Sequence, residues 1–189
     1  HSDIDLIVLV KGAADAQEYI RVGDRLVDIR YGEHKAVGED LESSPRLAPL
    51  LRKGRVLYDH DGIAGKLIDK AAQRFRQGPP PASLHEQIRL KADCLHRLGK
   101  VEDLLDKPTT AHYLLQAFFE ECVTAFFRIR GFWLTSPVDV LRFMASRDQA
   151  LGDVASQFLS AATLHDRLTC GRRFADILFK DIPLPPRVD

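Results

Sequence analysis

The chain has 189 residues, of which 45% are hydrophobic and 29% are charged, and its 27 Lys and Arg residues balance its 27 Asp and Glu residues. This composition predicts a folded protein of one large or two small domains and excludes a disordered chain. The charge balance argues against an extended nucleic-acid surface. No apolar run reaches the ~18 residues of a membrane span, so a membrane is not an expected partner either.

The first half of the chain predicts a small sheet. Residues 4–10 form a short, wholly apolar run that is typical of a buried strand, and residues 24–31 alternate between apolar and polar side chains as a second strand does. Residues 55–59 predict a third strand that ends at a turn. Between the strands, residues 13–20 fit a short helix or a loop, and one or two short helices are expected near residues 46–52.

After this turn the spacing of apolar side chains changes from two to three and four, which predicts helices. The first helix is expected over residues 63–75. The segment 78–83 then interrupts the chain, because its three successive prolines cannot continue a helix. Further helices are expected over residues 84–105, 109–130, 136–144, 150–162 and 164–179.

This order of elements predicts an α+β fold. A small mixed β-sheet domain over residues 1–78 is followed by an all-α helical bundle over residues 82–180 and a proline-rich tail over residues 181–189. One helix of the bundle is rich in phenylalanine and carries more apolar surface than one core needs, which predicts a homodimer. Its phenylalanines are Phe118, Phe119, Phe126 and Phe127.

The three cysteines, Cys94, Cys122 and Cys170, are far apart in the sequence and include no Cys-x-x-Cys spacing. This pattern argues against both a disulfide framework and a Cys-ligated zinc site, and it favours a reducing compartment. We therefore expect a cytoplasmic protein whose thiols are small buried side chains of the helices.

Two carboxylates stand at the start of the first strand. Because side chains alternate along a strand, Asp3 and Asp5 project from one face with Cβ atoms ~7 Å apart, and a cation between them would relieve their repulsion. Carboxylate oxygens suit Mg²⁺, which also takes phosphate oxygens as ligands. Asp28 interrupts the second strand and joins the pair if the two strands are neighbours. The alternative is that the Asp-x-Asp pair is only a polar surface turn.

These residues resemble a known family. "SDIDLIVLV" is similar to the second half of the signature of nucleotidyltransferases with the polymerase-β fold, and "RLVDIRY" is similar to the neighbouring strand that carries their third Asp. "RVLYDHDG" resembles the closing strand and turn of the small bacterial members. The resemblance covers roughly residues 2–62. It implies an enzyme that transfers a nucleoside monophosphate from ATP or another NTP to a hydroxyl.

The resemblance also implies roles for individual residues. Asp3 and Asp5 would coordinate Mg²⁺ and the triphosphate, Asp28 would complete the metal site and act as the base, and Ser2 would contact a phosphate. The Gly-Ser turn that holds the triphosphate in this family is not in the sequence, which starts at His1 without a Met. We expect either that further residues precede His1 or that this copy is incomplete.

The helical half resembles, in pattern rather than in motif, the C-terminal helical domain of kanamycin-nucleotidyltransferase-type enzymes. In the antibiotic-modifying members this domain shapes the acceptor pocket, so the resemblance implies that Glu120 and Glu121 attract a cationic aminoglycoside. The alternative is that the two Glu residues form the solvated edge of a helix. The implied acceptor is a small molecule such as an antibiotic, or a protein side chain.

Two other functions stay open. The first alternative is a toxin–antitoxin component that modifies or neutralises a helical partner protein. The second alternative is a non-catalytic binding protein whose nucleotide site has decayed. A copurifying helical protein would favour the first function. A natural N-terminus without the Gly-Ser turn would favour the second.

Overall fold

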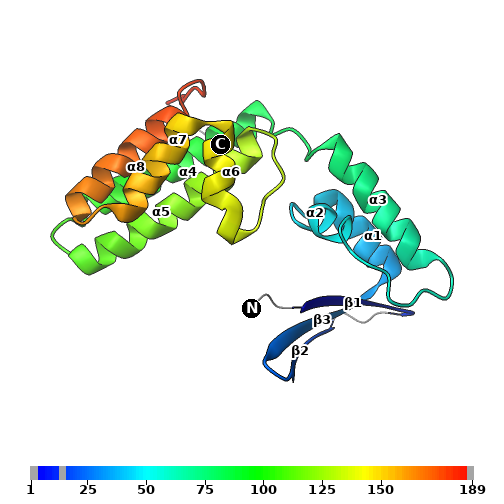
Figure 1. The fold of residues 1–189 in the computed structure, drawn as a ribbon. Coiled ribbons are helices and arrows are strands. Elements are labelled where there is room, and N and C mark those ends of the chain that lie inside the picture. Colours follow the sequence, from blue (N-terminus) through cyan, green and yellow to red (C-terminus); the bar gives the residue numbers. More distant parts are fainter. Residues whose placement is uncertain (1–3, 13–15, 187–189) are drawn as a thin grey trace. The chain divides into compact units, whose positions relative to one another are not determined.

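The computed structural model describes residues 4–12 and 16–186 (Figure 1). The chain divides into two compact units, of which one ends at Gly78 and the other begins at Pro79. In the described residues, the first unit combines a small mixed sheet with short helices, and the second unit is helical throughout. The fold is therefore α+β, as the order of elements predicts.

The sheet of the first unit contains, among the described residues, the strands β1 (Ile4–Val10), β2 (Ala16–Val22) and β3 (Arg25–Glu33). The strand order is β1-β3-β2, with β1 parallel to β3 and β2 antiparallel to it. β1 and β3 confirm the two strands predicted from periodicity. The parallel pairing of β1 with β3 makes direct neighbours of two strands that are distant in sequence.

β2 occupies most of the segment that was expected to be a short helix or a loop, and that expectation was wrong. β2 and β3 form a hairpin in which Val22 pairs with Arg25 across a two-residue turn. Gly23 opens this turn with a φ of +65°, a conformation that glycine adopts without steric cost. A Gly-Asp pair between β-forming residues is itself a hairpin signal.

The sheet buries one of its faces. Val27 and Ile29 of β3 are buried, and the adjoining helix α1 (His34–Ser43), which contacts β3, contributes the buried Val37. β1 was expected to be a buried strand, and this expectation was wrong, because its residues are exposed or half-buried and Ile4 is 43% exposed. In the described part of the chain β1 pairs with β3 alone, so it is an edge strand.

The remaining helices of the first unit are α2 (Leu47–Leu51) and α3 (Ile63–Gln77). Both confirm helices predicted from the sequence. Residues 55–59, however, form no strand, and Leu57 and Tyr58 are 75% and 84% exposed. This segment instead leads into α3, where the Asp59 carboxylate accepts hydrogen bonds from the backbone N–H groups of the first helical turn.

The cap at the start of α3 makes a pH-dependent contribution to stability. Hydrogen bonds from the backbone N–H of Gly65 and of Ile63, each 3.0 Å long, lower the pKa of Asp59 below its ordinary value of 3.8. Asp59 therefore stabilises the folded chain fully above pH 3.8, and this stabilisation is lost as the pH falls through the lower pKa of the folded state.

We therefore expect Asp59→Ala to lower the melting temperature at pH 7 and to differ less from the wild type below pH 3.8. Thermal unfolding followed by circular dichroism at a series of pH values from about 2.5 to about 7, a range that includes the ordinary carboxyl pKa, measures this difference. The matched control is Asp61→Ala, an exposed charge two residues along, which should leave the melting temperature nearly unchanged. If Asp59→Ala lowered the melting temperature equally at both ends of the pH range, the ionised Asp59 carboxylate would not be the cap that stabilises α3.

The second unit confirms the helices predicted after the proline-rich segment. They are α4 (Leu84–Glu102), α5 (Pro108–Ile129), α6 (Val140–Arg147) with a preceding 3₁₀ turn η1 (Pro137–Asp139), α7 (Gln149–Ser160) and α8 (Leu164–Leu178). Ser83 caps α4, because its hydroxyl oxygen accepts a 3.1 Å hydrogen bond from the backbone N–H of Glu86. Nowhere in residues 4–12 and 16–186 is a helix long and apolar enough to span a bilayer.

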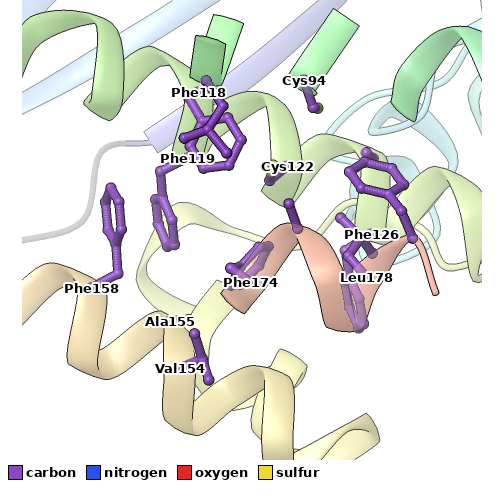
Figure 2. Close-up of a cluster of buried hydrophobic side chains, with 14 of the residues drawn as sticks. Cys94, Phe118, Phe119, Cys122, Phe126, Val154, Ala155, Phe158, Phe174 and Leu178 are labelled. Carbon is purple, nitrogen blue, oxygen red and sulfur yellow. The ribbon is translucent and has the colours of Figure 1, made fainter. Parts of the chain in front are cut away.

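The core of the second unit is built around α5, which contacts both α4 and α8. Phe119 of α5 stacks on Phe158 of α7 with 4.5 Å between ring centroids, and it meets the edge of Phe174 of α8 at 5.5 Å (Figure 2). The buried phenylalanines of α5 are Phe118, Phe119, Phe126 and Phe127. All four are covered within one chain, so the expected excess of apolar surface on this helix is not found, and the homodimer stays a prediction without that support.

The cysteines differ in their access to solvent. Cys94 of α4 and Cys122 of α5 are buried free thiols, whereas Cys170 is half-buried. Burial raises the pKa of the Cys122 thiol far above its ordinary value, so almost none of it is the nucleophilic thiolate at neutral pH.

We therefore expect iodoacetamide at pH 8 to alkylate Cys170 in the folded protein and to reach Cys122 only after unfolding in urea. Peptide mass spectrometry of native and urea-treated samples measures the labelling of each thiol. Cys170→Ser serves as the control, since it should remove the native-state labelling. Labelling of Cys122 at the rate of Cys170 in the native protein would contradict this packing.

Candidate functional site

The candidate site lies on the sheet of the first unit, where the parallel pairing of β1 with β3 brings two of the predicted carboxylates together. Asp5 of β1 is the register partner of Asp28 of β3. Directly paired residues on neighbouring strands project from the same face of a sheet, and the strands are ~4.8 Å apart. Asp3 and Ser2, the other two residues predicted for this site, lie outside the described residues.

The two carboxylates share the solvent-accessible face of the sheet. Val27 and Ile29, which flank Asp28 along β3, are buried on the opposite face. Asp5 is exposed and Asp28 is half-buried. The alternation that buries the apolar side chains of β3 therefore turns Asp28 towards the accessible face that also carries Asp5.

A side chain of β2 holds the Asp28 carboxylate. The Nε2 atom of Gln17 donates to Oδ1 of Asp28 at 2.7 Å and to Oδ2 at 3.0 Å. The same nitrogen donates to the Tyr19 hydroxyl oxygen at 2.8 Å, and Tyr19 is the register partner of Asp28 on β2. Sequence reasoning missed both Gln17 and Tyr19, although strand alternation before the Gly-Asp turn would have placed them on the face that carries Asp28.

The pairing of two anions across neighbouring strands is unfavourable unless a positive charge lies between them. Asp5 and Asp28 offer hard oxygen donors on an accessible face, and this donor set fits Mg²⁺ together with water and phosphate oxygens. Within the described ranges, no three His, Cys, Asp or Glu side chains group closely enough to hold a metal ion. The described residues therefore provide a pair of carboxylate ligands and not a complete protein cage.

The predicted acceptor residues lie on α5 in the second unit. Glu121 forms an ion pair with Arg97 of α4, with 2.6 Å between Oε2 and Nε, and this hydrogen bond raises the pKa of Arg97. Glu120 is exposed and accepts a 3.2 Å hydrogen bond from Gln116. The charge of Glu121 is thus already balanced within the protein, whereas Glu120 faces solvent.

A shallow hollow of about 230 Å³ lies beside this ion pair. Its lining comes from α4 and α5 and consists of Asp93, His96, Arg97, Lys100 and Glu121. Because its lining includes both acidic and basic side chains, the hollow has no strong charge of one sign. The charges of the lining therefore do not single out a cationic acceptor.

Comparisons with known proteins identify the fold. No known family matches the sequence, and no curated protein matches it. Among solved structures, the chain is similar to a nucleotidyltransferase-like protein from Exiguobacterium sibiricum 255-15, with a TM-score of 0.57 and 14% sequence identity. The match covers 93% of this chain and 61% of the solved chain, so this chain spans about three fifths of that protein's length. The chain therefore has an α+β fold of the nucleotidyltransferase-like kind.

Proposed function

We propose that this chain is a metal-dependent nucleotidyltransferase that moves a nucleoside monophosphate from ATP or another NTP to a hydroxyl group. The observation that carries the proposal is the register pairing of Asp5 with Asp28 on parallel neighbouring strands. If the Asp-x-Asp pair were only a polar surface turn, there would be no reason for a third acidic residue at the paired position of the next strand. The similarity of fold to a nucleotidyltransferase-like protein supports the same class of reaction.

The residues of the site divide the work between binding and proton transfer. A bound Mg²⁺ would supply the positive charge that offsets the carboxylates and the phosphate oxygens of the nucleotide. Asp5, together with Asp3, would hold this charge, and Ser2 would contact a phosphate. Asp28 completes the ligand set and accepts the proton of the attacking hydroxyl.

The reaction is an in-line displacement at the α-phosphorus. The acceptor oxygen forms a new bond to the α-phosphorus as the bond between this phosphorus and the bridging oxygen of pyrophosphate breaks. The hydroxyl proton passes to the Asp28 carboxylate, and pyrophosphate leaves with the electron pair of the broken bond. The acceptor hydroxyl belongs to a small molecule such as an aminoglycoside, or to a protein side chain. On α5, the exposed carboxylate of Glu120 is the charge available to attract a cationic acceptor, because Glu121 is paired with Arg97.

The direct test incubates the chain with Mg²⁺ and each α-phosphate-labelled NTP against aminoglycosides, lincosamides and candidate proteins as acceptors. Transfer of label with release of pyrophosphate supports the proposal and names the acceptor. Titration calorimetry with each NTP, with and without Mg²⁺, tests the site without an acceptor. If no NTP binds in the presence of Mg²⁺, the proposal is wrong and a non-catalytic binding protein is favoured.

A further inference from the structure

Gln17 makes contacts that the proposed reaction does not yet use. Its amide nitrogen reaches both oxygens of the Asp28 carboxylate, at 2.7 Å and 3.0 Å, and the Tyr19 hydroxyl at 2.8 Å. Gln17 lies two residues from Tyr19 on β2, so both side chains share the face that carries Asp28. A single amide thus spans the carboxylate and a phenol on the accessible face of the sheet.

We propose that Gln17 is a positioning residue that fixes the rotation of the Asp28 carboxylate for a divalent cation shared with Asp5. This inference rests on the proposed metal-dependent function. It adds a residue from the antiparallel edge strand to a site otherwise built from β1 and β3. In this role Gln17 acts through Asp28 and is not itself a ligand of the metal or the nucleotide.

The hydrogen-bonding capacity of the amide supports this role. An amide nitrogen has two hydrogens, of which one can serve the carboxylate and the other the Tyr19 oxygen. The flipped amide would point its oxygen at the two carboxylate oxygens of Asp28, so the observed orientation is the one that attracts. With its amide held by Tyr19, Gln17 limits the rotation of Asp28 about its terminal bond.

The absence of charge on Gln17 matters equally. Each carboxylate oxygen offers two lone-pair sites, so a donor on one side of Asp28 leaves capacity for a cation on the other. A Lys or Arg in the same place would neutralise the negative charge that the cation needs. The neutral amide orients the Asp28 ligand and leaves its charge for the metal, which is how outer partners of metal-bound carboxylates act.

The test measures cation binding without turnover, using Mn²⁺ alone as a paramagnetic substitute for Mg²⁺. Electron paramagnetic resonance of unbound Mn²⁺ gives the affinity, and the Mn²⁺-induced rise in melting temperature gives an independent readout. Gln17→Leu removes the amide donor and keeps a side chain of similar size. Gln17→Asn keeps the amide but shortens the side chain by one methylene, which moves the donor away from Asp28. Glu18→Gln, on the same strand but on the opposite face, is the matched control.

We expect both Gln17 variants to bind Mn²⁺ about 10-fold to 100-fold more weakly than the wild type, with the melting temperature of the metal-free protein unchanged. Glu18→Gln should bind like the wild type. The inference is overturned if Asp28→Asn loses Mn²⁺ while both Gln17 variants bind within about twofold of the wild type. If Asp28→Asn itself keeps wild-type Mn²⁺ affinity, the metal site of the proposed function is wrong, and the inference falls with it.

Discussion

Asp28→Asn is expected to lower nucleotidyl transfer by roughly 10²-fold to 10⁴-fold, the range over which loss of a general base acts. The substitution keeps the size of the side chain and an oxygen that accepts from Gln17, so the β2–β3 hairpin should fold normally. It removes the negative charge and the basic oxygen to which the proposed function assigns cation binding and uptake of the hydroxyl proton. The measurement is the initial rate of label transfer from α-phosphate-labelled NTP at saturating Mg²⁺, with circular dichroism as a check of folding.

The matched control for this variant is Asp24→Asn, four residues earlier in the two-residue turn between β2 and β3. It removes the same charge from the same hairpin but outside the register pair of Asp5 and Asp28. We expect Asp24→Asn to transfer label at the wild-type rate. Equal rates for Asp24→Asn and Asp28→Asn would show that Asp28 takes no part in the reaction. The register pair of Asp5 and Asp28 would then have no catalytic role.

Gly152→Ala is expected to destabilise the helical unit strongly. A Cβ atom at this position of α7 would lie 2.5 Å from both Cα and Cβ of Ala145 in α6. The obstacle is helix backbone, which cannot rotate away as a flexible side chain can, so the two helices must separate. Overpacking a core costs about 1–3 kcal/mol, and we expect a value near 3 kcal/mol here. Urea unfolding followed by circular dichroism measures this change in the free energy of unfolding.

Gly99→Ala, in α4, is the matched control for this substitution. A Cβ atom at Gly99 would have no neighbour within 4 Å, so alanine adds no clash there. Alanine is favoured over glycine within a helix by about 0.5–1 kcal/mol, so Gly99→Ala should stabilise the protein by this amount. The two Gly-to-Ala changes are thus expected to have opposite signs. A Gly152→Ala protein as stable as the wild type would show that α6 and α7 are not in the close contact described.

Within the sheet, local pattern was sufficient for some strands and misleading for others. The apolar run of β1 and the alternation of β3 located both strands, because a period of two is a property of consecutive residues. Residues 55–59 have the composition of a strand but form none in the structure. A strand forms only beside another strand that has free backbone N–H and C=O groups. The sequence of residues 55–59 does not show whether such a strand lies close enough to pair with it.

The helical unit was the most predictable part of the chain. α4, α5, α7 and α8 were located by apolar side chains at spacings of three and four, with Ser83 as a cap and prolines before the first turn. The number of neighbours around α5 was not predictable in the same way. Helical periodicity shows which face of a helix is apolar, but not whether helices of the same chain or of a second chain cover it.

For the candidate site, local sequence was enough to propose that carboxylates such as Asp5 and Asp28 act together, since residue type and alternation show which side chains can share a face. Their meeting as direct register partners was decided by the parallel pairing of β1 with β3, a contact between segments more than a dozen residues apart. The hydrogen bonds from Gln17 to Asp28 depend in turn on the register of the β2–β3 hairpin. Register is set by long-range packing and turn geometry together, so no single strand encodes it.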